Sequence, residues 1–455
     1  MKTYDVIVVG SGSGGEIVDA ALSHGLTVAW IDKGPLGGTC LNVGCIPSKT
    51  VIHPANRIME IYEAKKLGIT AEIKNIDFQA ILRHVQGPIH ESHEAMEKGI
   101  SQVKNLDYYH DEGRFIKDYT LEVSGQVIQG EKIFLVSGAR PLIPPIEGLK
   151  SVPFLTNENV FSLKEKPRSM IIIGGGYIAV EFAHFFSAVG TEVTIFQRGS
   201  RLISNSEPEI SDTLKNNLEK RLKIYLNTEV VRVQKKGDTI LVQGKNSVSG
   251  EERAVSAETI FVAAGRKSNA DLLKVHQTGV FTDKQGYIQV NEFLETSKKN
   301  IWAFGDAIGK AMFKHVANEE AGIAWNNAFH EKKVKMQYQA VPYAVFTYPE
   351  IASVGLTEEQ AKKNSQILIG TARYSDVAMG EAMREYEGFA KAIIEKNSGK
   401  ILGFHIIGPH ASMLIQEVIN AMALGGNIAF LSQGMHIHPA LTEVILRTFG
   451  NLNEV

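Results

Sequence analysis

The stretch Val6-Ile7-Val8-Val9-Gly10-Ser11-Gly12-Ser13-Gly14-Gly15 decides the fold class of this chain. The continuous apolar run at its start predicts a buried strand of a parallel sheet. Helical spacing over 16–23 and a second apolar run over 27–31 predict a helix and a further strand. Strand, glycine turn, helix and strand in this order are typical of a Rossmann-like unit, so we expect an α/β fold.

The glycines of this stretch have the spacing of a dinucleotide-binding fingerprint. Gly10 permits the tight turn, Gly12 lets the backbone approach a pyrophosphate, and Gly15 lets the helix pack on the strand. The helix N-terminus offers N–H groups and a partial positive charge to the phosphates. Asp32 ends the second strand, where a carboxylate can bind a ribose hydroxyl. We therefore predict a dinucleotide site here, against the alternative of a purely structural glycine turn.

The same unit recurs over 170–196, with Gly174, Gly176 and Ala179 in the glycine positions. No acid ends the second strand of this copy; Gln197 and Arg198 stand there instead, with Arg201 close by. An arginine can pair with the 2′-phosphate that a carboxylate would repel, so the pattern favours NADPH over NADH. The alternative is that Arg198 and Arg201 are solvated surface charges.

Two copies of one βαβ unit imply two nucleotide-binding domains. We assign 1–145 to the first, 146–266 to the second and 267–338 to a return into the first. A proline-rich segment that ends at Pro145 reads as the linker between them. From about 339 to 455 strands alternate with helices in a new pattern. The predicted fold class is therefore α/β, with two Rossmann-like nucleotide-binding domains plus a C-terminal α+β domain.

Charge and hydropathy exclude several kinds of partner. The 455 residues carry a formal net charge of −2, which provides no basic footprint for nucleic acid and no polybasic membrane patch. There is no apolar run long enough to predict a membrane-spanning helix. The N-terminus enters an apolar strand directly and does not resemble a signal peptide, so we expect a cytoplasmic protein.

The chain has only two cysteines, Cys40 and Cys45, just after the first nucleotide unit. A structural disulfide framework or a zinc site would need more ligands, more widely spaced. Two close cysteines read better as a redox pair, because a helix N-terminus favours the thiolate. Lys49 would lie on the same helical face as Cys45. The alternative is a pair of buried, inert cysteines.

Near the C-terminus, His438 and Glu443 have the spacing of an acid–base dyad. A carboxylate can fix the orientation of an imidazole and raise its basicity. The neighbouring His436 competes for the same role. A different cluster, His90-Glu91-Ser92-His93-Glu94, matches neither common zinc-protease signature, so we read it as a solvated helix face and predict no metal.

The stretch Gly37-Gly38-Thr39-Cys40-Leu41-Asn42-Val43-Gly44-Cys45-Ile46-Pro47-Ser48-Lys49 resembles the pyridine nucleotide-disulfide oxidoreductases. The resemblance extends over essentially the whole chain. It implies FAD in the first nucleotide site, NADPH or NADH in the second, and an obligate homodimer formed through the C-terminal domain. It also implies that Cys45 contacts the flavin as the charge-transfer thiol and that Cys40 attacks the substrate.

Further roles follow from the same resemblance. Lys49 would pair with Glu181 beside the flavin, and the Tyr177 ring would gate the nicotinamide pocket. His438 would act in the active site of the partner subunit. Gly305 and Asp306 match the second FAD motif, with Asp306 on the ribitol. The other cofactor-binding residues that the resemblance implies are Lys33, Gly38, Thr39, Gly138 and Gly265.

Within the family, stretches at 181–188, 268–273, 314–318 and 438–443 look most like the mycothione reductases, which indicates reduction of a low-molecular-weight thiol disulfide. Dihydrolipoyl dehydrogenase of the 2-oxoacid complexes, with a lipoyl substrate, is the alternative. An NAD(P)H oxidase or transhydrogenase with silent cysteines is a third reading, and a flavin-binding sensor without turnover is a fourth. Mercuric reductase is disfavoured because no further cysteine pair follows.

Overall fold

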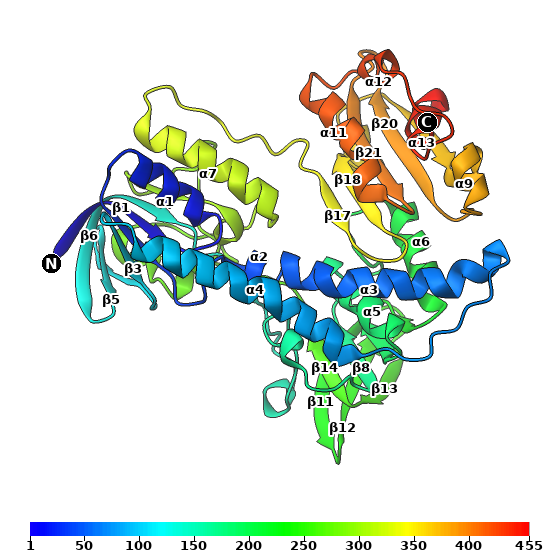
Figure 1. The fold of residues 1–455 in the computed structure, drawn as a ribbon, viewed down its shortest axis with the longest axis horizontal. Coiled ribbons are helices and arrows are strands. Elements are labelled where there is room, and N and C mark those ends of the chain that lie inside the picture. Colours follow the sequence, from blue (N-terminus) through cyan, green and yellow to red (C-terminus); the bar gives the residue numbers. More distant parts are fainter. Residues whose placement is uncertain (455) are drawn as a thin grey trace. The chain divides into compact units, whose positions relative to one another are not determined.

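The computed structural model describes residues 1–454, in two compact units that are each assembled from separate stretches of chain (Figure 1). Unit 1 comprises Met1–Pro47, Leu82–Leu142 and Gly265–Tyr338. Unit 2 comprises Ser48–Ile81, Ile143–Ala264 and Gln339–Val455. Two helices, α3 (Cys45–Glu63) and α4 (Phe78–Ser101), carry residues of both units.

Unit 1 contains a seven-stranded sheet built around β1 (Lys2–Val9). β1 pairs in parallel with β2 (Val28–Ile31) on one side and with β6 (Gln126–Leu135) on the other. The predicted strand Val6–Val9 is at most 4% exposed, but β1 begins earlier because its pairing with β6 starts at Lys2. In sheets of this kind, ligands bind at the carboxyl ends of the strands, at the point where the connections lead to opposite sides of the sheet. In unit 1 this point is the end of β1.

The helix that follows β1 is α1 (Gly14–Ser23), which buries Gly14, Ile17, Val18 and Ala21. It lies beside α7 (Lys314–Phe329) in the same unit (Figure 1). The remaining elements of unit 1 are α2 (Gly38–Asn42), β3 (Leu106–Tyr109), β4 (Arg114–Lys117), β5 (Thr120–Val123), β7 (Ala139–Pro141), β15 (Arg266–Ser268), η4 (Asn269–Asp271), η5 (Val275–Thr278), β16 (Ile301–Ala303) and η6 (Gly305–Ala307).

Unit 2 contains the second nucleotide-binding sheet, in the parallel order β10-β9-β8-β14. Between β8 (Ser169–Ile173) and β9 (Glu192–Phe196) runs α5 (Tyr177–Ala188), which is buried on nearly every side. The other elements of this part are η1 (Ala64–Leu67), η2 (Leu149–Ser151), η3 (Val160–Ser162), α6 (Pro208–Glu219), β10 (Lys223–Tyr225), β11 (Thr228–Lys236), β12 (Thr239–Asn246), β13 (Glu252–Ala257) and β14 (Thr259–Val262).

The C-terminal part of unit 2 is a six-stranded sheet in the order β17-β18-β21-β20-β19-β22, with helices on its apolar face. The elements are β17 (Tyr343–Val345), β18 (Ile351–Gly355), α8 (Glu358–Lys362), β19 (Ile367–Arg373), η7 (Tyr374–Asp376), α9 (Ala378–Ala382), β20 (Phe389–Glu395), β21 (Ile401–Ile407), α10 (Ala411–Leu414), α11 (Gln416–Ala423), α12 (Ala429–Gln433), α13 (Glu443–Gly450) and β22 (Leu452–Glu454).

The order of elements confirms the predicted fold class: a parallel βαβ unit in the mixed sheet of unit 1 and another in the parallel sheet of unit 2, followed by an antiparallel sheet with helices. The predicted linker is partly strand, because β7 ends at Pro141 and pairs with β15. Among residues 1–454, no helix combines the length and the apolar character needed to span a membrane.

Candidate active site

The glycine-rich loop between β1 and α1 leaves one side of its backbone open. Gly10 has φ of +115°, and a Cβ there would lie 2.1 Å from the carbonyl oxygen of Val136. A Cβ at Gly12 would meet no atom within 4 Å. The loop is thus packed at Gly10 against Val136, the residue after β6, and is free on the side of Gly12. A pyrophosphate can approach this free side and the N-terminus of α1.

The close approach between helix and strand occurs at Gly14. A Cβ at Gly14 would lie 2.9 Å from Val8 Cγ1, whereas a Cβ at Gly15 would come no nearer than 3.9 Å to Trp30. The prediction that Gly15 provides this packing is therefore wrong. Helix α1 begins at Gly14, so this residue faces β1 and Gly15 is turned away from it.

The carboxylate of Asp32 closes the turn that follows β1. Its Oδ2 accepts a hydrogen bond of 2.6 Å from the Ser11 backbone N–H, and its Oδ1 accepts one of 2.8 Å from Gly34. Asp32 is therefore brought to the glycine loop as the fingerprint requires. Lys33, beside it, is exposed and lies 4.0 Å from a Glu112 carboxylate oxygen.

A cavity of about 520 Å³ lies against this loop within unit 1. Its lining includes Ser11, Gly12, Cys40 and Lys314. The hydroxyl oxygens of Ser11 and Ser137 are buried and have no hydrogen-bond partner among residues 1–454. Buried polar atoms normally have a partner, so this loop fits a bound polar group such as FAD, whose phosphates and hydroxyls would supply one.

The two cysteines meet at the edge of that cavity. Cys40 lies in α2, and Cys45 is the first residue of α3. Both are thiols, and a hydrogen bond to the Cys45 side chain, together with burial, raises the pKa of Cys40. The turn between them is tight, because a Cβ at Gly44 would lie 2.7 Å from the Thr39 carbonyl oxygen. The N-terminus of a long helix favours a thiolate at Cys45.

The second part of the FAD motif lies in the same unit. Asp306 Oδ2 lies 3.3 Å from Arg266 Nε, and burial raises the pKa of Asp306 against the effect of that guanidinium. The Gly305 N–H donates to a buried carboxylate oxygen of Glu320 at 2.7 Å. Glu320 has no sequence signal of its own. Gly38 approaches Gly12 so closely that a Cβ there would lie 2.8 Å from its Cα.

The second glycine loop repeats the geometry of the first. Gly174 has φ of +122°, and a Cβ there would lie 2.2 Å from the Ala263 carbonyl oxygen, while Gly176 is open. Tyr177 begins α5 and is 36% exposed. Arg198 is exposed just beyond β9, where a nucleotide phosphate can reach it. The two loops therefore present the same kind of surface to a dinucleotide.

Lys49 and Glu181 form an ion pair within unit 2. Lys49 Nζ lies 2.8 Å from Glu181 Oε2, and Glu181 Oε1 accepts the Phe346 N–H at 3.0 Å. Lys49 also lies 4.6 Å from the centre of the Phe346 ring. Three separate stretches of chain thus meet at this ion pair. Phe346 was not predicted, because it belongs to no motif.

His438 and Glu443 form the predicted dyad, with His438 Nδ1 2.9 Å from Glu443 Oε1. The hydrogen bonds from His438 and from the Ala440 N–H lower the pKa of Glu443. The competing His436 makes a hydrogen bond of 2.6 Å between its Nε2 and Glu417 Oε1, and its side chain is largely buried. His436 is therefore paired with a different carboxylate, and His438, whose side chain is 71% exposed, is the histidine that contacts Glu443.

The histidines of the 90–94 cluster and the remaining predicted cofactor-binding residues lie in several different elements. His90 makes an exposed contact of 3.1 Å with Glu94, and His93 Nε2 contacts Asn42 Oδ1 at 2.6 Å. Gly138 and Gly265 have φ of +65° and +128°, which suits glycine at both positions. Thr39 lies in α2 beside Cys40, and Ala179 is fully buried in α5.

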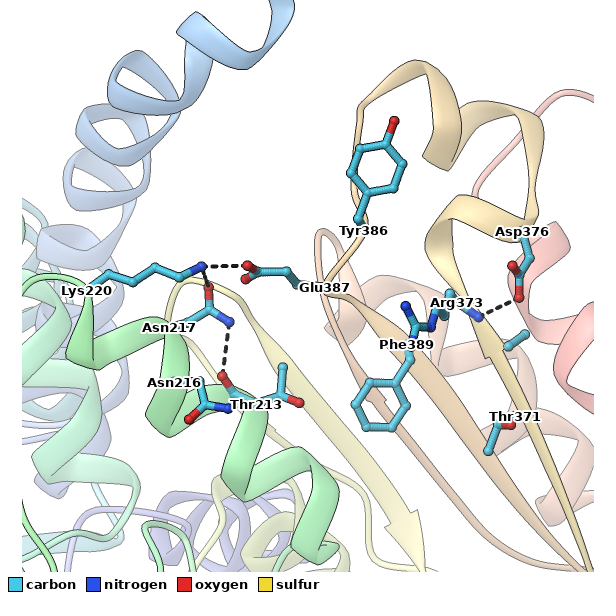
Figure 2. Close-up of a pocket in the computed structure, with 11 residues that line it drawn as sticks. Thr213, Asn216, Asn217, Lys220, Thr371, Arg373, Asp376, Tyr386, Glu387 and Phe389 are labelled. Atoms are coloured by element: carbon cyan, nitrogen blue, oxygen red, sulfur yellow. Dashed lines mark hydrogen bonds and ion pairs between the residues drawn. The ribbon is translucent and has the colours of Figure 1, made fainter.

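Unit 2 holds a further cavity of about 650 Å³, lined by α6 and by residues of β19 and β20 (Figure 2). Its charged lining residues are two cations, Lys220 and Arg373, and two carboxylates, Asp376 and Glu387. Lys220 is already paired with Glu387 at 2.6 Å. None of the predicted site residues lies here, and the balanced charge selects no class of ligand.

Two family models match the chain. The family model for pyridine nucleotide-disulphide oxidoreductases matches residues 4–321, and the model for the dimerisation domain of these proteins matches residues 341–448. Mycothione reductase of Mycobacterium tuberculosis is 36% identical over 458 residues, with 98% of each chain covered.

Other relatives have different activities. Dihydrolipoyl dehydrogenase of Chlamydia trachomatis is 32% identical and covers 97% of this chain and 95% of its own length. Mercuric reductase of Staphylococcus aureus is also 32% identical, with 97% and 81% covered. Among solved structures, the HOCl-induced flavoprotein disulfide reductase RclA of Escherichia coli superposes with a TM-score of 0.88 at 27% identity, with 99% of both chains covered.

Proposed function

The chain belongs to the pyridine nucleotide-disulphide oxidoreductase family, and from this premise we propose that it reduces the disulfide of a low-molecular-weight thiol through Cys40 and Cys45. Membership confirms the resemblance predicted from residues 37–49. The chain is accordingly an oxidoreductase acting on sulfur groups, with FAD and NAD(P)H as its cofactors.

The contact between the two thiols carries the proposal. The thiols share a hydrogen bond, and Cys40 lines the unit 1 cavity, where a disulfide substrate can meet it. FAD and NAD(P)H, when bound, would supply the electron pair that reduces the Cys40–Cys45 disulfide to two thiols. The Cys40 thiolate then attacks the substrate disulfide and releases one thiol. Cys45 attacks the resulting mixed disulfide, releases the second thiol and restores the starting disulfide.

The leaving thiolate needs a proton, and His438 is the group that we assign to supply it. Its Nδ1 is held by Glu443, which keeps the ring in one orientation and stabilises the imidazolium. We propose that it acts from the second copy of the chain in a homodimer, since the dyad lies in the part that matches the dimerisation domain.

The substrate and the nucleotide are narrower proposals. Four stretches of the sequence resemble the mycothione reductases, and the similarity to the mycobacterial enzyme extends over 98% of the chain. Arg198 supports NADPH, because an exposed guanidinium at the end of β9 suits a 2′-phosphate. The use of only two cysteines, both for redox chemistry, suits the reducing environment of the cytoplasm.

A rate assay on the purified flavoprotein tests the proposal. NADPH and NADH are each offered with mycothiol disulfide, glutathione disulfide, bis-γ-glutamylcystine and lipoamide. We expect turnover of one small disulfide with NADPH, and loss of that turnover in Cys40→Ser. Fast lipoamide turnover with NAD(H) would identify a dihydrolipoyl dehydrogenase instead. Full disulfide turnover in Cys40→Ser would overturn the cysteine mechanism.

A further inference from the structure

The unit 1 cavity contains a lysine, Lys314, to which the sequence patterns assign no role. Lys314 is the first residue of α7 and lines the cavity together with Gly12 and Cys40. Lys314 is the only cationic residue of the lining, and the one acidic residue there is Asp19. Lys314 Nζ donates to Ser13 Oγ at 3.0 Å, and no carboxylate among residues 1–454 lies within ion-pair distance of it.

Ser13 holds this ammonium at the start of α1. The residue is buried and occupies the N-cap position, but its hydroxyl does not cap the helix. The hydroxyl donates instead to Asn318 Oδ1 at 2.8 Å, which leaves its lone pairs for Lys314. Lys314 and Asn318 lie one turn apart on α7, so one helix provides both ends of the chain of hydrogen bonds.

The place where the ammonium is held is suited to an anion. The open side of Gly12 and the N-terminus of α1 face the same cavity, and a helix N-terminus carries a partial positive charge. The Ser11 hydroxyl, which also lines the cavity, is buried without a partner among residues 1–454. A half-buried ammonium and a buried hydroxyl both gain from an anionic oxygen at this point.

We propose that Lys314 is a ligand of the FAD pyrophosphate, presented by Ser13 and Asn318 as a fixed positive charge beside the glycine loop. The interaction is independent of which disulfide the enzyme reduces. The nearest competing role is electrostatic support of the cysteine pair. The pKa of Cys40 is raised first by its hydrogen bond to Cys45 and by burial, and the charge of Lys314 opposes that rise.

Titration of the apoprotein with FAD, followed by the quenching of flavin fluorescence, tests the proposal. We expect Lys314→Met to weaken FAD binding at least about tenfold, the loss of one charge-assisted contact. Lys314→Arg should retain affinity within a few fold because it keeps the charge. Lys299→Met is the matched control: Lys299 is exposed and lies outside the cavity. The Lys299→Met variant should bind FAD with the affinity of the wild type.

Added salt separates charge from packing. FAD binding should weaken with KCl in the wild type and in Lys314→Arg, and less so in Lys314→Met. Ser13→Ala removes the oxygen that holds the ammonium and should give an intermediate loss, which keeps the test decisive if Lys314→Met fails to fold by circular dichroism. Unchanged FAD affinity in folded Lys314→Met, with Cys40 alkylation displaced to higher pH, would overturn the proposal and assign Lys314 to the thiolate.

Discussion

Lys49 Nζ lies 2.8 Å from Glu181 Oε2, although the two residues belong to different helices and different motifs. Glu181 is 6% exposed and Lys49 is 36% exposed at the side chain, so the carboxylate is the fixed partner. The Phe346 N–H holds its second oxygen. We therefore regard Glu181 as a positioning residue that determines where the ammonium of Lys49 stands.

Glu181→Gln keeps the shape of the side chain but removes the charge that holds Lys49. We expect flavin reduction by NAD(P)H to slow about tenfold to a hundredfold, because misplaced charges in an active site cost rate of this order. Stopped-flow absorbance of the flavin measures this step alone. The control is Glu192→Gln, whose carboxylate is exposed and pairs with Lys223. Equal rates of flavin reduction in the two variants would show that Glu181 does not influence this step.

His438→Gln should slow thiol–disulfide exchange by about 10²–10⁴, the usual contribution of a general acid, while flavin reduction stays unchanged. Because its hydrogen bond to His438 lowers the pKa of Glu443, this carboxylate stays ionised down to pH values below its ordinary range. We therefore expect that titration of Glu443 produces no acidic limb in the pH–rate profile above about pH 5. His436→Gln is the matched control, since His436 is bound to Glu417.

Arg198 provides a test of nucleotide choice. If its guanidinium pairs with the 2′-phosphate, Arg198→Ala should raise the KM for NADPH about tenfold or more and leave the KM for NADH nearly unchanged. Steady-state kinetics with both nucleotides measure the ratio. Arg201→Ala serves as a control, being an exposed arginine of the same loop. An unchanged ratio in Arg198→Ala would mean that this residue is a solvated surface charge.

Lys391 is the centre of a buried charge cluster in unit 2. Its Nζ lies 2.7 Å from Glu207, 2.7 Å from Glu358 and 2.9 Å from Glu209, and its side chain is 3% exposed. Lys391→Met should destabilise the protein by about 3–5 kcal/mol, since it leaves buried carboxylate unpaired. Lys220→Met is the control, because Lys220 forms an exposed ion pair with Glu387. Its loss should lower the free energy of unfolding by at most about 1 kcal/mol. Chemical denaturation measures both.

The same cluster predicts a pH dependence. Burial lowers the pKa of Lys391, but the hydrogen bonds that Lys391 donates to the three glutamates outweigh this and raise its pKa above the ordinary 10.5. Hydrogen bonds from Lys362 and Lys391 lower the pKa of Glu358 below its ordinary 4.5. The contribution of Lys391 is thus complete below pH 10.5 and lost in stronger alkali, and that of Glu358 is complete above pH 4.5 and lost in acid. The difference in unfolding free energy between wild type and Lys391→Met should shrink at both extremes.

Gly14 and Gly15 are neighbours with opposite expectations. Gly14→Ala brings a Cβ to 2.9 Å from Val8 Cγ1, and overpacking of this kind costs about 1–3 kcal/mol. Gly15→Ala meets nothing closer than 3.9 Å and should be neutral or slightly stabilising, because alanine favours the helix. Thermal unfolding of the two variants decides between them. Equal stability would place the helix–strand contact elsewhere.

Short-range patterns in the sequence were enough to predict much of this protein. The apolar runs, the glycine loops and the helical spacing identified both βαβ units, because each depends on residues within a few turns of one another. The pair Cys40 and Cys45 could be read in the same way. The same reasoning placed the helix–strand contact at Gly15, since spacing alone does not show at which residue α1 begins.

Pairings between distant parts of the chain were decided only by the tertiary structure. It selects His438 over His436 by engaging His436 with Glu417, and it brings Lys314 to Ser13. The physical reason is range: backbone propensity and hydrophobic period act locally, whereas a hydrogen bond between remote residues exists only where the packed elements bring its two atoms together. The sequence by itself determined the elements and the chemistry they carry, and packing determined which side chains meet.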